Sequence, residues 1–236
     1  MQHMTATNAQ GVRARVRQEL TSEILDAARR QLAAVGPAAL SLRAVARDMG
    51  MVSSAVYRYF PSRDELLTAL IVAAYDDLGA AAERAEAEIR RGDLNGRWRA
   101  VCRAVRTWAV EHPHEYALLY GTPVPGYVAP QRTIPSANRV PALLIALLTE
   151  VAARERAGRR SRAVIPRRAR TAFASARAAM GSGPTDDLIV RGISAWSWLF
   201  GAVSLELFGH RVGSVDDYAV FFDLELDRMA TFVGIS

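Results

Sequence analysis

Several side chains that donate hydrogen bonds lie in residues 41–60, near the amino end of the chain, and Arg63 follows shortly after. Hydroxyl, phenol and guanidinium groups all donate, and the guanidinium also carries a fixed positive charge. On one exposed surface, such groups suit the phosphate oxygens and base edges of a DNA duplex. The residues that we predict to bind DNA in this way are Ser41, Arg43, Ser53, Ser54, Tyr57, Arg58, Tyr59 and Arg63.

Two short helices joined by a glycine are predicted to hold these side chains, with Ser41 placed to cap the first helix. The residues that give this first helix one apolar face are Leu42, Val45, Ala46 and Met49. Gly50 lies at the sharp turn, where glycine takes a left-handed conformation without steric cost. The second helix, roughly residues 52–59, is too short to be stable alone, so Val56 and Phe60 are expected to pack inward. This pattern is typical of a helix-turn-helix whose second helix enters the major groove.

The flanking segments predict two further helices. Before the stretch, apolar residues recur with a helical period until Gly36 and Pro37. These residues are Val16, Leu20, Ile24, Ala28 and Leu32. After the stretch, Ser62 and Glu65 have the spacing of a capping box, and we expect a long helix over residues 63–91. A three-helix head would therefore lead into a long fourth helix.

Residues from about 16 to 75 resemble the DNA-binding head of the TetR (tetracycline-repressor-type) family of bacterial transcriptional regulators. The matching positions are Ile24, Ala27, Ala28, Ser41, Leu42, Val45, Ala46 and Gly50, followed by residues 56–60 and 62–67. Two positions depart from the family pattern. Met51 and Val52 replace the usual valine and serine after the turn glycine, which removes a hydroxyl cap from the second helix. Arg63 replaces the usual lysine and keeps its charge.

The rest of the chain shows helical periodicity and no strand pattern, so the predicted fold class is all-α. The expected helices cover residues 97–111, 112–120, 141–156, 166–180, 185–208 and 215–232. Prolines and glycines make residues 121–136 a predicted loop. We divide the chain into a disordered N-terminal tail (1–12), a helix-turn-helix DNA-binding domain (13–62), and a C-terminal regulatory and dimerisation domain (63–236).

The middle of the chain, about residues 95–212, resembles the WHG type of C-terminal ligand-sensing domain found on some TetR-family regulators. The positions that carry this resemblance include Trp108, His112, Pro113, Tyr116, Gly121, Tyr127, Trp196, Gly201 and His210. A cavity that senses a small apolar or aromatic ligand needs apolar walls with a few polar groups, which Trp and Tyr supply. The predicted lining residues are Trp98, Trp108, Tyr116 and Tyr120, although such aromatic stripes more often form an ordinary core.

The last two predicted helices contain more apolar residues than a terminal helix pair on a monomer normally exposes. The family resemblance implies that this pair meets a second copy in a four-helix interface. Two-fold symmetry also suits the head, because one head reads few base pairs and two heads read a palindrome. The predicted interface residues are Leu188, Ile193, Trp196, Phe200, Val203, Tyr218, Phe221 and Phe222.

Catalytic, metal and cofactor chemistry are not predicted. His112 and His114 flank a proline and have no adjacent cysteine or aspartate, so we expect no metal site there. The sequence has neither a Gly-rich phosphate loop nor a nucleophile elbow. The single cysteine, Cys102, excludes an internal disulfide framework. Without an apolar run of transmembrane length or a secretory signal, the sequence predicts a cytoplasmic protein with no membrane partner.

The 236-residue chain has a net charge of +6, and all its basic residues are arginine. In residues 1–65, nine arginines face six acids, which suits phosphate binding. Within that part, Arg13, Arg15 and Arg17 form an arm that either reaches into a minor groove or is simply solvated. Residues 154–177 contain nine arginines and one acid. A solvated connector explains them better than a second nucleic-acid contact, and pairing with acidic C-terminal helices is a third explanation.

Together these patterns predict a ligand-responsive transcriptional repressor that binds a palindromic operator as a homodimer. Its partners would be double-stranded DNA, a second copy of the chain and an unknown small apolar or aromatic ligand, with no cofactor. Two other classes stay open. One is an activator or a ligand-independent architectural DNA-binding protein, and the other is a helical enzyme that has adopted the fold.

Overall fold

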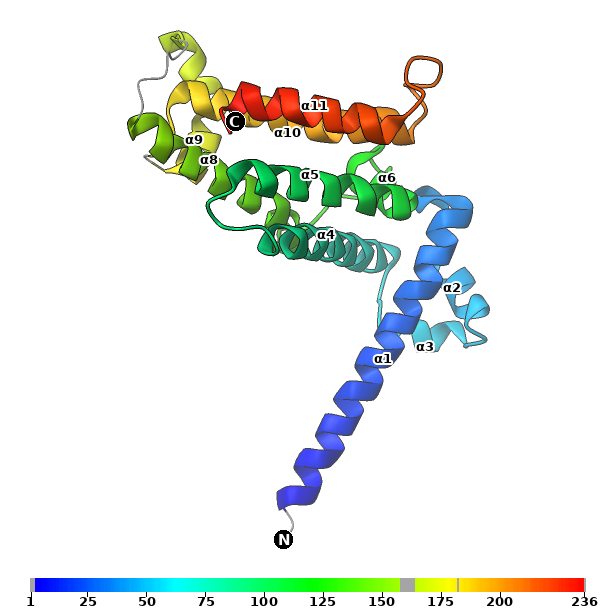
Figure 1. Ribbon diagram of the computed structural model, residues 1–236. Coiled ribbons are helices and arrows are strands. Elements are labelled where there is room, and N and C mark those ends of the chain that lie inside the picture. Colours follow the sequence, from blue (N-terminus) through cyan, green and yellow to red (C-terminus); the bar gives the residue numbers. More distant parts are fainter. Residues whose placement is uncertain (1–2, 158–163, 182, 236) are drawn as a thin grey trace. The chain divides into compact units, whose positions relative to one another are not determined.

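The protein is all helical in a computed structural model that describes residues 3–157, 164–181 and 183–235. Every regular element in these ranges is a helix, which confirms the predicted fold class (Figure 1). One of these helices, α10 (Asp186–Leu207), is long and apolar enough to cross a membrane by length and composition, a test that core helices of soluble proteins also pass.

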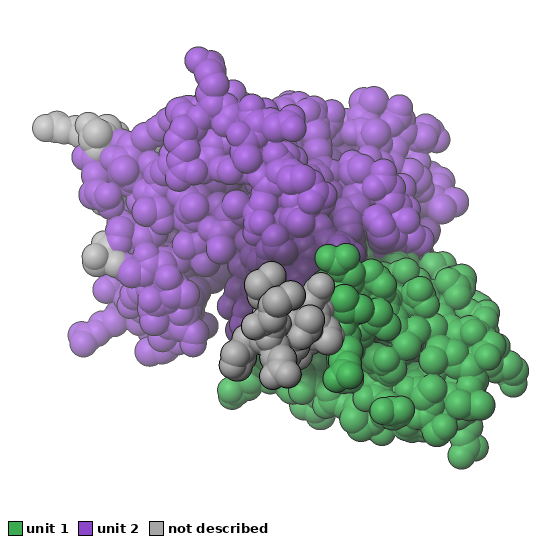
Figure 2. Space-filling view, turned by 90° about the horizontal axis from the view of Figure 1, so that it is seen from below, with its two compact units in different colours: residues 1–74, 114–133 green, residues 75–113, 134–236 purple. Residues whose placement is uncertain are grey.

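The chain divides into two compact units, shown in separate colours in Figure 2. Unit 1 comprises Met1–Ala74 and His114–Thr133, and unit 2 comprises Tyr75–Pro113 and Ile134–Ser236. This division assigns residues 114–133 to the same unit as the head, whereas we predicted one continuous C-terminal domain from residue 63.

Unit 1 contains the predicted three-helix head. Helix α1 (His3–Val35) leads through a 3-10 turn, η1 (Pro37–Ala39), into α2 (Leu42–Asp48), α3 (Ser53–Tyr57) and the start of α4 (Arg63–Ala87). The buried apolar side chains of the head include Ile24, Ala27, Ala28, Leu32, Leu42, Val45, Ala46, Val56, Phe60, Leu66 and Leu67. This set confirms that the short second helix of the motif is stabilised by packing through Val56 and Phe60.

Helix α1 begins earlier than its apolar period predicts. Residues 3–12, which we predicted to be a disordered tail, are helical. The stripe of apolar residues is buried only from Ile24 onward, whereas Val16 is 53% exposed. The second half of α1 therefore packs on the head, and the first half extends beyond α2 and α3 (Figure 1).

The turn between α2 and α3 forms around Gly50, whose φ is +66° as predicted. The amide of Gly50 donates to Arg47 O at 3.1 Å and that of Met51 to Ala46 O at 2.8 Å, so α2 ends in a Schellman motif. The predicted cap at Ser41 is wrong, because its side chain accepts no hydrogen bond from α2. Ser41 instead donates its backbone N–H to Gln31 Oε1 at 2.7 Å.

The start of α4 is fastened to residues of the segment 114–133 within unit 1. Ser62 Oγ accepts from the amide of Glu65 at 3.2 Å, as the capping box predicts. The Glu65 carboxylate does not complete that box but pairs with Arg132 at 2.5 Å. Tyr127 and Thr68 share a hydroxyl hydrogen bond of 2.9 Å. The other elements here are α6 (Pro113–Tyr120) and the 3-10 turn η2 (Gln131–Thr133).

Unit 2 is a helical bundle built around α5 (Leu94–Glu111). This helix packs against α8 (Arg139–Ala157), α10 and α11 (Tyr218–Val233), and α10 packs against α8 and α11. The shorter elements of the unit are α7 (Ile134–Ala137), η3 (Arg167–Phe173) and α9 (Ala174–Met180). Two predictions need correction: residues 121–136, predicted as a loop, include η2 and part of α7, and residues 166–180, predicted as one helix, form η3 and α9.

Two buried arginines stabilise the bundle through ion pairs. Arg97 is 1% exposed, and its guanidinium contacts Glu86 at 2.5 Å and Glu150 at 2.8 Å. Arg191 contacts Glu155 at 2.7 Å and Asp187 at 3.1 Å. Each guanidinium is thus surrounded by carboxylates, as a buried charge requires, because losing one partner would leave the other charge uncompensated.

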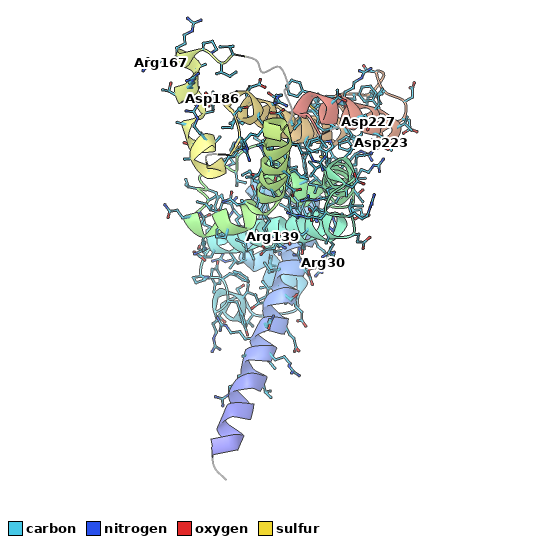
Figure 3. All side chains as sticks on the ribbon, turned by 60° about the vertical axis from the view of Figure 1, so that its left-hand side comes forward. Arg30, Arg139, Arg167, Asp186, Asp223 and Asp227 are labelled. Carbon is cyan, nitrogen blue, oxygen red and sulfur yellow. The ribbon has the colours of Figure 1, made fainter. Side chains whose placement is uncertain are left out.

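Part of the arginine-rich stretch 154–177 lies outside the described residues. Of the arginines that are described, Arg170 and Arg177 form ion pairs with Asp186 at 3.0 and 2.6 Å. Figure 3 labels Asp186 at the start of α10. These two contacts support pairing with the acidic C-terminal helices, the third explanation for this stretch.

Candidate nucleic-acid interface and cavities

Helix α3 and its C-cap residue, Arg58, expose three of the predicted DNA-binding side chains. Ser54, Tyr57 and Arg58 are accessible, and Tyr57 is 40% exposed. Val56 of the same helix is fully buried, so one face of α3 is anchored and the other is free. Arg43 on α2 is exposed as well. Unit 1 therefore presents a hydroxyl, a phenol and two guanidinium groups on accessible surface of the helix-turn-helix.

Three further predicted residues are half-buried. Ser41 lies just before α2 and Ser53 is the first residue of α3. Tyr59 follows α3, and the guanidinium carbon of Arg17 lies 5.0 Å from the centroid of its ring. This is the distance of a cation–π contact. It connects the extended part of α1 to the end of the recognition segment, a pairing that no local sequence pattern predicts.

Arg63 has a different environment from the other predicted residues. Its guanidinium donates to the carbonyl oxygens of Pro37 at 2.8 Å and Ala38 at 3.2 Å, and its side chain is 29% exposed. A guanidinium engaged in this way has fewer N–H groups left for a phosphate. The geometry therefore favours a positioning role, in which Arg63 ties the start of α4 to η1.

Of the four predicted ligand-binding aromatics, Trp108 lines a cavity of appreciable size. The cavity measures about 500 Å³ and is formed in unit 2 by residues of α4, α5 and the following His112. Its lining residues are Asp77, Ala80, Ala81, Arg84, Ala104, Thr107, Trp108, Glu111 and His112. Trp108 is 5% exposed, and its Nε1 has no hydrogen-bond partner among the described residues. A buried donor without an acceptor is an unusual feature in a folded protein.

His112 stacks on Trp108 with ring centroids 5.0 Å apart. Its Nδ1 lies 3.0 Å from the carbonyl oxygen of Trp108, at the end of α5. Since a carbonyl oxygen only accepts, Nδ1 must carry the proton of this bond. His112 is thus a hydrogen-bond donor at the end of α5.

The other three predicted aromatics are not among the residues that line this cavity. Trp98 packs against Trp198 at 6.3 Å in the bundle core and donates from Nε1 to Leu226 O at 3.3 Å. Tyr116 and Tyr120 lie in unit 1, where their ring centroids are 5.1 Å apart. A ligand site lined by all four side chains stays a prediction.

The predicted dimer-interface residues fall into two groups. Leu188, Val203 and Phe222 are at most 2% exposed, because they pack inside unit 2, and so they offer no surface to a partner. Ile193 is 38% exposed, and the others are buried or half-buried. Further accessible apolar residues lie on α10 and α11 or directly after α10, and these are Leu205, Phe208, Val220, Leu224 and Phe232.

No group of three or more His, Cys, Asp or Glu side chains is placed to hold a metal ion in the described part of the chain. Cys102 is completely buried, and burial raises the pKa of its thiol well above the usual value. A thiol in that state is a poor nucleophile, since the thiolate is the reactive form.

Two protein-family models match the chain. The model of bacterial regulatory proteins of the tetR family matches residues 24–70, and that of the tetracyclin repressor-like C-terminal domain matches residues 98–229. An HTH-type transcriptional regulator of Mycobacterium tuberculosis is 41% identical over 226 residues, which cover 94% of this chain and 95% of the relative. A regulator of Mycobacterium bovis matches to the same extent. The crystal structure of SCO4313, a candidate regulatory protein, superposes with a TM-score of 0.71 and 33% identity, covering 92% of this chain and 98% of the other.

Proposed function

Because the chain belongs to the TetR family of bacterial transcriptional regulators, we propose that it is a ligand-responsive repressor that binds a palindromic operator as a homodimer. The observation that carries this proposal is the exposed surface of α3 and its C-cap, where Ser54, Tyr57 and Arg58 follow the turn at Gly50. A protein that binds DNA must have access to the chromosome, so we propose that it is cytoplasmic.

In the proposed complex, α3 lies in the major groove. Arg43 and Arg58 neutralise phosphates, which supplies most of the sequence-independent affinity. Ser54 and Tyr57 donate to phosphate oxygens or base edges and so fix the register of the helix. Because α3 is only five residues long, one head contacts few bases, and a second head related by two-fold symmetry completes the site.

The cavity beside Trp108 is the proposed effector site. Its lining combines alanines with the charged side chains Asp77, Arg84 and Glu111. The unpartnered Trp108 Nε1 is a donor only, so a ligand that reaches it must supply an acceptor oxygen or nitrogen. The ligand class that fits is a small molecule with an apolar or aromatic body and at least one acceptor. It would act through its different affinities for two states of the dimer, typically about 1–3 kcal/mol of coupling.

A selection of duplexes from a random-sequence pool, using the full-length protein, tests the DNA-binding proposal. We expect enrichment of a palindromic motif and a dimer on each bound duplex. Ser54→Ala and Tyr57→Phe should each weaken binding to the selected duplex by roughly 0.5–1.5 kcal/mol, the net contribution of one hydrogen bond. Failure to enrich any sequence would contradict the proposal, as would binding of a single protomer to a site without symmetry.

The effector proposal has its own test. Small molecules with an aromatic body and an acceptor are screened by thermal shift, and hits are assayed for release of the selected duplex. Trp108→Phe keeps an aromatic side chain and removes the Nε1 donor, so it should reduce ligand affinity while leaving operator affinity unchanged. If hits bind the variant as tightly as the native protein, the ligand does not occupy this cavity.

A further inference from the structure

The first half of α1 has unusual exposure for a helix. Residues 11–19 are all exposed. Figure 1 shows this part of α1 extending past α2 and α3. A helix without packing partners is marginally stable in water, because tertiary contacts normally supply most of its stability. An extended helix of this kind is therefore well suited to bind a partner outside the unit.

The charged residues of this extension are all basic up to residue 18. Arg13, Arg15 and Arg17 are its basic residues, and no acidic residue precedes Glu19 in the chain. A cluster of exposed guanidinium groups attracts phosphates and repels a second copy of itself. Its charge thus complements a nucleic-acid duplex.

Only one face of the extension is continuous with the helix-turn-helix. An α-helix turns by about 100° per residue, so Arg13 and Arg17 lie roughly 40° apart, and Arg15 lies on the far side. Arg17 covers the ring of Tyr59 at 5.0 Å, directly after α3. Arg13 is then one turn further out on the same face, about 6 Å along the helix axis.

We propose that the face of α1 carrying Arg13 and Arg17 is a second DNA-binding element, which binds phosphates of the base pairs flanking those read by α3. The proposal rests on the proposed function and adds a contact outside the helix-turn-helix. Arg17 bridges the two elements, because its guanidinium contacts Tyr59 while its side chain stays exposed. Arg13 is the outer contact and extends the bound stretch of DNA.

The exposed apolar residues Val12 and Val16 offer a competing explanation, since they are 56% and 53% exposed. They could pack against the same helix of another copy. Such pairing would bring two sets of three arginines together, and like charges in close contact are unfavourable. The charge therefore favours DNA over a second copy, and the experiment separates the two.

The test compares Arg13→Gln with Arg15→Gln, two variants that remove the same charge from opposite faces. Affinity for the duplex selected by the native protein is measured across a range of salt concentrations. Each phosphate contact contributes about 0.9 to the slope of log K against log salt for each protomer. We expect Arg13→Gln to lose about one such contact per protomer and Arg15→Gln to keep the native slope.

A second arm shortens the duplex by removing the base pairs that flank the palindrome. Shortening should weaken the native protein and Arg15→Gln, and it should have little further effect on Arg13→Gln. Equal loss of slope in both arginine variants would overturn the assignment of one face. Native slopes in both variants, with tight operator binding, would show that the face of α1 carrying Arg13 and Arg17 does not bind DNA. That result would leave the proposed function intact.

Failure of the native protein to select any duplex would instead overturn the proposed function itself. The competing explanation is tested by molar mass in solution without DNA. If Val12→Ser combined with Val16→Ser lowers the mass of the native assembly while both arginine variants keep native slopes, the extension binds a second copy and the proposal is wrong.

Discussion

Arg63 donates a 2.8 Å hydrogen bond from its guanidinium to the carbonyl oxygen of Pro37. The two residues belong to the start of α4 and to η1, so the bond ties together the ends of two segments of the head. The sequence alone suggested that this arginine contacts phosphate. Its position in the structure suggests that it mainly fixes the orientation of α4 in unit 1.

Replacing Arg63 by alanine should therefore destabilise the head. Hydrogen bonds of a charged group contribute roughly 1.5–3 kcal/mol each, and a lower melting temperature is expected. The salt slope of DNA binding should stay near its native value. Arg58→Ala, an exposed arginine on the same surface, is the matched control and should show a reduced slope with an unchanged melting temperature. The reverse pattern would identify Arg63 as the phosphate ligand.

The hydroxyl pair of Thr68 and Tyr127 should behave as a coupled unit. Thr68 Oγ1 donates its only hydrogen to Asp64 O at 2.8 Å, so Tyr127 must donate in the 2.9 Å bond between them. Tyr127→Phe should lower the free energy of unfolding by about 0.5–1.5 kcal/mol. In a double-mutant cycle with Thr68→Val, the two losses should not add. Additive losses would show that the two hydroxyls are independent.

Gly79→Ala should destabilise α4 although alanine is the better helix former. A Cβ at this position would lie 2.7 Å from Cβ of Arg139, a side chain labelled in Figure 3. The helix propensity gain is about 1 kcal/mol, whereas overpacking costs about 1–3 kcal/mol. Arg139 would also be displaced from Glu83, which it contacts at 2.6 Å.

Urea denaturation measures the change in the free energy of unfolding that Gly79→Ala causes. Gly201→Ala is the control, because Gly201 also lies inside a helix but has no atom within 4 Å of an added Cβ. The control should be neutral or stabilised by up to about 1 kcal/mol. Stabilisation of Gly79→Ala to the same extent would show that α4 and α8 tolerate a larger side chain at their contact.

The contact between α5 and α11 should weaken in acid. Arg103 and Asp223 form a bidentate pair with both distances at 2.8 Å, and Asp223 lies beside Asp227 on α11 (Figure 3). The hydrogen bond from Arg103 lowers the pKa of Asp223. A carboxylate whose pKa is lower in the folded state stabilises the fold above its unfolded pKa, and this contribution is lost as pH falls through the folded value.

Melting temperatures of the native protein and Asp223→Asn, measured between pH 7 and pH 3, test this effect. The native protein should be more stable at neutral pH, by at most about 1 kcal/mol because the pair is exposed. The difference should shrink below about pH 4, where the unfolded carboxyl protonates. A difference that stays constant over the whole range would show that the ion pair does not cause it.

Leu224→Glu should disrupt the proposed homodimer. Leu224 is 47% exposed on α11, and a charge there would be buried without a partner if α10 and α11 meet a second copy. Val110→Glu on α5 is the matched control, because Val110 is 46% exposed and lies on another helix. Molar mass in solution should fall to that of a monomer only for the Leu224 variant. A fall in both variants, or in neither, would contradict an interface on these two helices.

The sequence by itself determined the local features of this protein. Gly50 predicts the turn, since glycine readily adopts a positive φ, and the spacing of Val56 and Phe60 predicts which side of the short helix is buried. Ser62 predicts the start of α4, because a cap bond spans only three residues. Each of these features depends on residues close together in the chain, where backbone geometry fixes which side chains meet.

Only the tertiary structure decided which distant groups meet. Glu65 has the spacing of a capping-box partner but pairs with Arg132, and the charged end of Arg17 lies over Tyr59. Contacts between distant segments also decide that Phe222 is buried while Leu224 is exposed on the same apolar helix, α11. Periodicity identifies an apolar helix, but which face is covered depends on how segments far apart in the chain pack together.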